Sequence, residues 1–323
     1  MTDTHRWLRR ASVPLMLGAG ALVASQARIN GELAERLGDG TRAAALAATI
    51  SFGSGLALLS ILVACRPSVR SGIGDIRTAL VARRIRPYEV LGGLGGAFFI
   101  ATQGLSVGTI GVALLIVAFT AGQSASSLLV DHLGWSPHGR HSIASARVLA
   151  AVLAVVAVVL TAGERLVRDT SALVVLFVLM AFVAGTLQAV QQALNGRVAA
   201  IGGSWATTWN NFLVGTAGLL VFLAISLVSD GKLDGLPGAW WLYLGGTCGI
   251  GFIWVASWAV QMHGVLVLGL CMIAGQVVTA EILDLASKDS HVGVVGVLAG
   301  VLPLVGVAIA LLSRRSSTPA TVI

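Results

Sequence analysis

Two six-residue stretches decide the fold of this chain: Gln26-Ala-Arg-Ile-Asn30-Gly31 and Gln191-Gln-Ala-Leu-Asn195-Gly196. Glutamine, asparagine and glycine recur at the same three positions, 165 residues apart. Both stretches lie in long apolar segments, where an amide side chain costs free energy unless another group satisfies it. A matched set of such costly residues indicates an internal repeat.

The match continues downstream of both stretches. Ser51-Phe52-Gly53-Ser54-Gly55 corresponds to Asn211-Phe212-Leu213-Val214-Gly215. An offset of 153 residues then superposes Gly92 on Gly245, Gly93 on Gly246, Gly96 on Gly249, Phe99 on Phe252, Gly111 on Gly264, and Ala121-Gly122-Gln123 on Ala274-Gly275-Gln276. Glycine and alanine recur by chance in membrane sequences, so the polar matches are the informative ones. We therefore predict two halves, residues 1–165 and 166–323.

The composition places both halves in a membrane. Of the 323 residues, 56% are hydrophobic and 11% are charged, whereas about 25% are charged in soluble domains. Because about 20 apolar residues cross a bilayer core, the chain is long enough for about ten crossings. The predicted fold class is an all-α polytopic membrane protein with ten transmembrane helices. The spans centre near Val23, Gly55, Ile100, Val117, Val152, Met180, Val214, Ile250, Cys271 and Val301.

The placement of Lys and Arg predicts the orientation of these spans. Most of the 21 basic residues, including those of the loop at about 65–89, fall on one face when successive loops are assigned to alternate sides. We expect this face to be cytoplasmic, with both termini inside. Five spans in each half is an odd number, so the second half enters the membrane from the opposite side. Inverted five-helix repeats of this kind are a usual construction of secondary transporters.

These residues also resemble a known family. Two halves of five spans, each with a Gln-xxx-Asn-Gly segment early and an Ala-Gly-Gln segment in its fourth helix, resemble the drug/metabolite transporter (DMT) superfamily. Within it, the chain resembles a fused two-repeat member of the YdcZ-type family over about residues 14–312. The resemblance implies a transporter of a small organic solute or metabolite in the bacterial cytoplasmic (inner) membrane. It implies alternating access through a central cavity, and export rather than import, but no particular solute.

Eight residues at membrane depth are candidate solute contacts: Gln26, Asn30, Gln123, Gln191, Asn195, Trp254, Trp258 and Gln276. The i, i+4 spacing of each Gln–Asn pair places both amides on one helix face. Asn before Gly is also typical of a helix end, so solute contact, gating and capping remain alternatives. Neutral glutamines could bind a polar solute without a buried charge. The tryptophans could stack on a flat or cationic solute, or pack against helices and lipid.

Three charged features complete the candidate site. Glu281 is the candidate for proton coupling, because desolvation inside a span raises the proton affinity of a carboxylate. Its counterpart is Leu128, so it lies outside the shared scaffold, and a position near the outer surface is the alternative. Arg28 could neutralise an anionic solute or reach the outer interface. The loop at 65–89 faces anionic lipid as a topology determinant or forms a short amphipathic surface helix containing Ile73, Ile76, Leu80 and Ile85.

Other classes of function have less support in the sequence. Cys65, Cys248 and Cys271 are widely spaced, which predicts free thiols and neither a metal nor a cofactor. A membrane-embedded lipid-modifying enzyme would need a nucleophile, base or metal cluster, which the sequence does not offer. A non-transporting scaffold would not need inverted repeats with matched polar residues. We expect no enzyme activity and no nucleic-acid partner, a small-molecule solute and the lipid bilayer as partners, and a monomer or homodimer.

Overall fold

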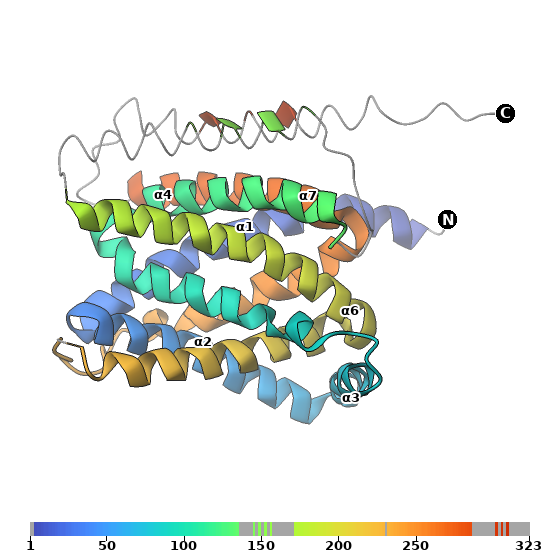
Figure 1. Cartoon of the computed structure of the whole chain (residues 1–323), viewed down its shortest axis with the longest axis horizontal. Helices are drawn as coiled ribbons and strands as arrows, with labels where there is room; N and C mark the ends of the chain where they lie inside the picture. The colour runs from blue at the N-terminus through green and yellow to red at the C-terminus, as the bar shows by residue number, and fades with distance from the viewer. Residues whose placement is uncertain are drawn as a thin grey trace.

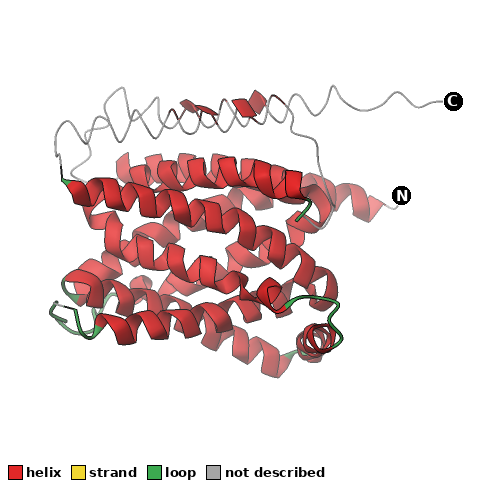
Figure 2. Cartoon of the chain, viewed as in Figure 1, coloured by secondary structure: helices red, strands yellow, loops and turns green. Residues whose placement is uncertain are grey.

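The structure, a computed structural model, covers the chain in three long stretches. It describes residues 3–135, 171–229 and 231–285, together with residues 145, 148, 149, 152, 153, 156, 301, 302, 305, 308 and 309. These residues are helical almost throughout, as Figure 2 shows. Within them the only extended pairing is an isolated bridge between Gly38 and Leu233. The all-α prediction is therefore confirmed for the described part of the chain.

The helices form a bundle around one main apolar core. Figure 1 shows the long helices running side by side. In chain order the elements are α1 (Asp3–Leu37), α2 (Gly40–Cys65), α3 (Pro67–Val81), the 3-10 helix η1 (Pro87–Gly92), α4 (Gly93–Leu133), α6 (Ala172–Ser226), the 3-10 helix η2 (Trp240–Leu244) and α7 (Gly245–Leu285).

Four described segments are long and apolar enough to cross a membrane: Gly40–Cys65, Pro87–Val130, Ala172–Ser226 and Trp240–Met262. The third has 55 residues and would be about 80 Å long if straight, against a bilayer core of about 30 Å. Two of the long helices contain a non-helical glycine: Gly111 of α4 (φ 75°, ψ 166°) and Gly203 of α6 (φ 78°, ψ 164°). Positive φ with this ψ is open essentially to glycine alone. Each glycine divides its helix into two arms.

The break inside α4 separates the two spans predicted near Ile100 and Val117. It lies at Gly111, and the neighbouring residues 107–109 are helical. A single glycine with positive φ changes the direction of the chain without a loop.

A short helix is present in the basic loop as α3, and it contains Ile73, Ile76 and Leu80. Ile85, the fourth residue predicted for it, lies beyond its end at Val81. The buried residues of α3 are Val69, Gly72, Ile76 and Ala79. Gly72 lies so close to the carbonyl of Gly202 that a Cβ atom would not fit between them. α3 therefore packs against α6 immediately before the break at Gly203. Its arginines Arg70 and Arg77, with Arg66 just before it, are exposed.

The turn between α1 and α2 is tied to the end of α6. The backbone N–H of Asp39 donates to the carbonyl of Lys232 at 3.0 Å. The guanidinium of Arg42 donates to three carbonyls, those of Leu227 (2.9 Å), Ser229 (2.7 Å) and Gly231 (3.2 Å). One arginine thus satisfies three backbone oxygens of the segment that follows α6.

Candidate functional site

Both Gln–Asn stretches lie in the interior of long helices. Asn30 is followed by seven further residues of α1, which ends at Leu37. Asn195 lies in the first arm of α6, which continues to the break at Gly203. The interpretation of these asparagines as helix ends is therefore wrong. All four matched amides are buried: Gln26, Asn30, Gln191 and Asn195.

Gln26 and Asn30 each bind a different helix. Gln26 Nε2 donates to the carbonyl of Gly245, the first residue of α7, at 2.8 Å. Asn30 Nδ2 donates to Oε1 of Gln103 in α4 at 2.7 Å. Ser51 of α2 lies beside them, because a Cβ on Gly245 would be 2.8 Å from Ser51 Oγ. We call Gln26, Asn30, Ser51 and Gln103 the first amide cluster.

Gln191 and Asn195 meet at the asparagine that corresponds to Ser51. Gln191 Nε2 donates to Oδ1 of Asn211 at 3.0 Å, and Asn211 Nδ2 donates to Oδ1 of Asn195 at 2.7 Å. These bonds join the two arms of α6. Gly92 lies against them, because a Cβ on Gly92 would be 2.8 Å from Asn195 Oδ1. We call Gln191, Asn195 and Asn211 the second amide cluster.

The matched glycines place helix against helix. A Cβ on Gly93 of α4 would lie 2.9 Å from the backbone N of Gly215 in α6. A Cβ on Gly246 of α7 would lie 2.7 Å from the backbone N of Gly55 in α2. Both distances are shorter than real Cβ contacts, so each helix pair depends on glycine. The start of α4 thus packs on the second half of the chain, and the start of α7 packs on the first.

Phe52 and Phe212 stack on one another. Their ring centroids are 4.8 Å apart with an interplanar angle of 29°, and both are buried. Gly55 lies against the ring of Phe212, and Gly215 lies against the ring of Phe52. Phe52 and Phe212 occupy corresponding positions in the two halves, so this contact joins two matched residues.

The two Ala-Gly-Gln segments lie at close contacts between helices. Gly122 of α4 packs against the carbonyl of Phe182 in α6, and Gly275 of α7 packs against the carbonyl of Leu17 in α1. The adjacent side chains of Gln123 and Gln276 are 1% and 0% exposed. Neither amide nitrogen and neither amide oxygen of this pair has a hydrogen-bond partner. Unpaired buried amides cost about 1–3 kcal/mol each, so these two side chains do not stabilise the fold by hydrogen bonding.

Three further glutamines are buried but have no polar counterpart in the other half of the chain: Gln103, Gln188 and Gln192. Their counterparts are Ala256, Val23 and Ala27, so the repeat gives no indication of them. The sequence feature that could have identified them is the position of each glutamine within an apolar span. Gln103 joins the first amide cluster, and Gln192 Nε2 contacts Sδ of Met272 at 3.7 Å. The carbonyl oxygens of Gln188 and Gln192 have no partner.

Trp254 and Trp258 form an indole wall together with Trp205 of α6. The rings of Trp254 and Trp258 are nearly parallel, 6.4 Å apart with an interplanar angle of 3°. The ring of Trp205 lies 5.2 Å from that of Trp254. All three are half-buried and pack against the main core. The wall joins α6 to α7, and its contact with a solute stays a prediction.

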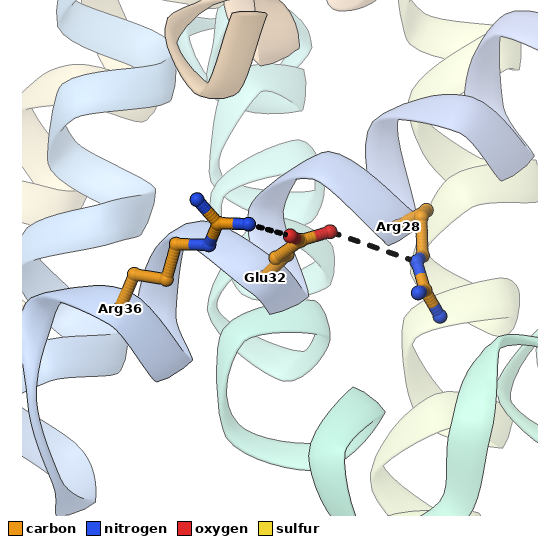
Figure 3. A network of polar contacts seen from close by, with 3 residues as sticks. All are labelled: Arg28, Glu32 and Arg36. Carbon is orange, nitrogen blue, oxygen red and sulfur yellow. Dashed lines mark hydrogen bonds and ion pairs between the residues drawn. The ribbon is translucent and has the colours of Figure 1, made fainter. Parts of the chain in front are cut away.

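Arg28 pairs with a carboxylate of its own helix. Its Nε atom is 3.8 Å from Glu32 Oε2, and Glu32 Oε1 is 2.5 Å from Arg36 (Figure 3). The Arg28 side chain is 41% exposed. Exposed ion pairs of this spacing contribute about 0.3–0.5 kcal/mol. The side chain of Glu281, the predicted coupling residue, lies outside the described residues.

Another ion pair joins η1 to α6. Glu89 Oε1 lies 3.8 Å from Arg197 Nη1, and Glu89 is buried. Arg197 Nη2 also donates to the carbonyl of Gly134, just after α4, at 3.2 Å. Asn210 Nδ2 donates to the carbonyl of Val90 at 2.8 Å. These contacts fix the start of α4 beside the break in α6.

Comparison with known proteins assigns the family. A family model described as "Putative inner membrane exporter, YdcZ" matches the chain in two segments, residues 12–160 and 176–309. The chain belongs to the YdcZ family. The predicted resemblance is confirmed, and two matched segments are what a fused two-repeat YdcZ member requires. Membership of YdcZ, together with the apolar helices, makes the chain a multi-pass inner-membrane protein of an exporter family.

Solved structures share the fold of this YdcZ member. One of them, described only as the crystal structure of a protein, aligns over 95% of this chain and 99% of its own with a TM-score of 0.65. The two sequences are 18% identical, so the likeness concerns the fold alone. No curated protein matches the sequence.

Proposed function

We propose that this protein is a secondary transporter of the DMT type, which moves a small organic solute across the inner membrane by alternating access. Its family supports membrane export as the class of function. The contact between Phe52 and Phe212 is the observation that carries the mechanism. When two repeats are related by a two-fold axis, a residue touches its own counterpart only at that axis.

Other contacts come in pairs under the same correspondence. Gly20 of α1 lies against the carbonyl of Met272, and its counterpart Gly185 lies against the carbonyl of Phe119. Phe119 is in turn the counterpart of Met272. The contacts of Gly122 and Gly275 described above form another such pair. These contacts support two interlocked halves related by a pseudo-two-fold axis.

The interlocked halves support ten spans. α1 and α2 supply one span each, and the two arms of α4, the two arms of α6 and the two apolar parts of α7 supply six. The remaining two centre on Val152 and Val301, which are both helical. Five spans in each half place the halves in opposite senses in the membrane. The basic loops then assign both termini to the cytoplasm.

In this arrangement the two amide clusters lie toward opposite membrane surfaces. The first cluster lies near the outer surface and the second near the cytoplasmic one. Inverted repeats can exchange the conformations of their two halves at little cost in free energy. We assign the first amide cluster as the outer gate and the second as the inner gate. The hydrogen bonds of one gate break while those of the other gate remain.

The test is solute accumulation in energised membrane vesicles. Untargeted mass spectrometry compares wild-type protein with the double variant Asn30→Ala/Asn195→Ala, in inverted and right-side-out vesicles, with and without an uncoupler. We expect one solute class to accumulate with the wild type, and the uncoupler to abolish this accumulation. If no solute differs between wild type and variant in either orientation, the transport proposal is wrong and a scaffold role replaces it.

A further inference from the structure

Gln123 and Gln188 are brought together by a close contact between α4 and α6. A Cβ on Gly185 of α6 would lie 2.8 Å from the backbone N of Gln123. Gln188 follows Gly185 by three residues, which is less than one helical turn. Each of these two glutamines is 1% exposed.

The same segment of α6 also contacts α7, the helix that carries Gln276. Gln192 Nε2, one turn after Gln188 on α6, donates to Sδ of Met272. Met272 lies one turn before Gln276 on α7. Residues 185–192 cover about 10 Å of helix. One short segment of α6 therefore contacts the parts of α4 and α7 that carry Gln123 and Gln276.

The amides of Gln123 and Gln276 are free to bind something else. By contrast, each buried glutamine of the two amide clusters makes at least one hydrogen bond, and so does Gln192. Among the described residues, only Gln123 and Gln276 have both amide atoms buried and unpaired. The Oε1 atom of Gln188 is unpaired as well. Four unpaired atoms at matched positions of the two halves leave donors and acceptors for a ligand.

The helix segments around these glutamines carry no charge as far as Glu281, which follows Gln276 by five residues, more than one helical turn. Residues 112–130, 172–196 and 265–280 contain no Asp, Glu, Lys, Arg or His. A charged solute bound at the glutamines would lose its hydration without an opposite charge beside it, which is costly. An uncharged polar solute needs only hydrogen bonds, and unpaired amides supply them.

We infer that Gln123 and Gln276, with Gln188 beside them, bind an uncharged solute through a group that carries a donor and an acceptor side by side, as a primary carboxamide does. A glutamine amide has two N–H donors and one carbonyl acceptor. It can pair with a carboxamide through two parallel hydrogen bonds. This inference rests on the proposed transport function and names its solute class.

Leucine substitutions separate a binding role from a structural one. Gln123→Leu and Gln276→Leu remove unpaired polar groups and break no hydrogen bond, so we expect each to raise the thermal midpoint of the protein in nanodiscs by about 2–4 °C. The matched control is Gln26→Leu, which leaves the carbonyl of Gly245 without its donor and should lower the midpoint. A lower midpoint for both Gln123→Leu and Gln276→Leu would assign these amides to helix packing and overturn the inference.

Three probes of one shape test the solute class. Benzamide, benzoate and benzylammonium share a ring and differ in charge. We expect millimolar benzamide to raise the midpoint of the wild type by about 2 °C. The other two probes, and benzamide on the double variant Gln123→Leu/Gln276→Leu, should give no shift. A shift with all three probes, an undiminished shift in the double variant, or none with benzamide would overturn the inference.

The vesicle assay distinguishes this site from the transport function. If the wild type and the double leucine variant accumulate the same solute equally, transport stands and the amide site is wrong. If benzamide binds through the two glutamines but the wild type accumulates nothing in either orientation, the binding site stands and transport is wrong.

Discussion

Gln26 and Asn30 lie one turn apart on α1, and each bonds to a different helix. Their counterparts Gln191 and Asn195 both bond to Asn211 instead. The two amide clusters thus share their helix positions but not their bonding partners. A serine at position 51, where the second half has Asn211, accounts for the difference, because a hydroxyl is too short to bridge the two amides.

We expect Asn30→Ala combined with Asn195→Ala to abolish transport while the protein remains inserted. Asn30→Ala leaves the buried amide of Gln103 without a partner, at a cost of about 1–3 kcal/mol, and Asn195→Ala removes one of the three hydrogen bonds of Asn211, at a cost of about 1 kcal/mol. Vesicle accumulation and the amount of membrane-inserted protein are measured together. Thr78→Ala, on the exposed side of α3, is the control and should behave as wild type. If the double variant accumulates the solute as the wild type does, the asparagines are not part of the gates.

Glu281→Gln should abolish proton-driven accumulation and leave downhill flux of the same solute intact. A carboxylate in a span can bind and release a proton, whereas an amide of the same shape cannot. The measurement compares uncoupler-sensitive uptake with counterflow in de-energised vesicles. Uptake that remains sensitive to the uncoupler in the variant would exclude Glu281 as the coupling residue.

Single glycines decide where the long helices change direction. Apolar length indicated the crossings, and the centre predicted for each lies in a helical position. Gly111 and Gly203 could not be recognised as breaks, because each is one of 40 glycines and only the φ angle distinguishes them. The same limit applies to the candidate site. The matched amides were recognisable in the sequence. Gln188 has no polar counterpart, and only the contact of Gly185 with α4 in the structure places it near Gln123.

Gly203→Ala should lower the free energy of unfolding by about 1–3 kcal/mol, because alanine is strained at a φ of 78°. Nothing crowds a Cβ at this position, so the expected loss comes from the backbone alone. Gly53→Ala in α2 is the matched control, since its Cβ also meets nothing within 4 Å. A helical site of this kind should gain about 0.5–1 kcal/mol. Denaturation midpoints of the two variants are compared, and equal midpoints would contradict strain at Gly203.

At the scale of the whole molecule, the halves exchange their packing partners. α1 packs against the end of α7, and the first arm of α6 packs against the end of α4. Sequence matching identified which residues correspond, but it could not tell whether each half folds on itself or on its partner. The contacts of Gly20 with Met272 and of Gly185 with Phe119 distinguish these arrangements, because each joins a helix of one half to a helix of the other.

The proposed inversion of the two halves makes a direct prediction for two turns. Asp39 lies in the turn between α1 and α2, and Ser204 lies beside Gly203 at the break of α6, between the two matched segments of the second half. In a background without the native cysteines, we expect a membrane-impermeant maleimide to label Asp39→Cys in intact cells. Ser204→Cys should be labelled only in inverted vesicles, because an odd number of spans separates the two turns. Labelling of both residues from the same side would mean that the halves are parallel, and alternating access by exchange of inverted repeats would then be wrong.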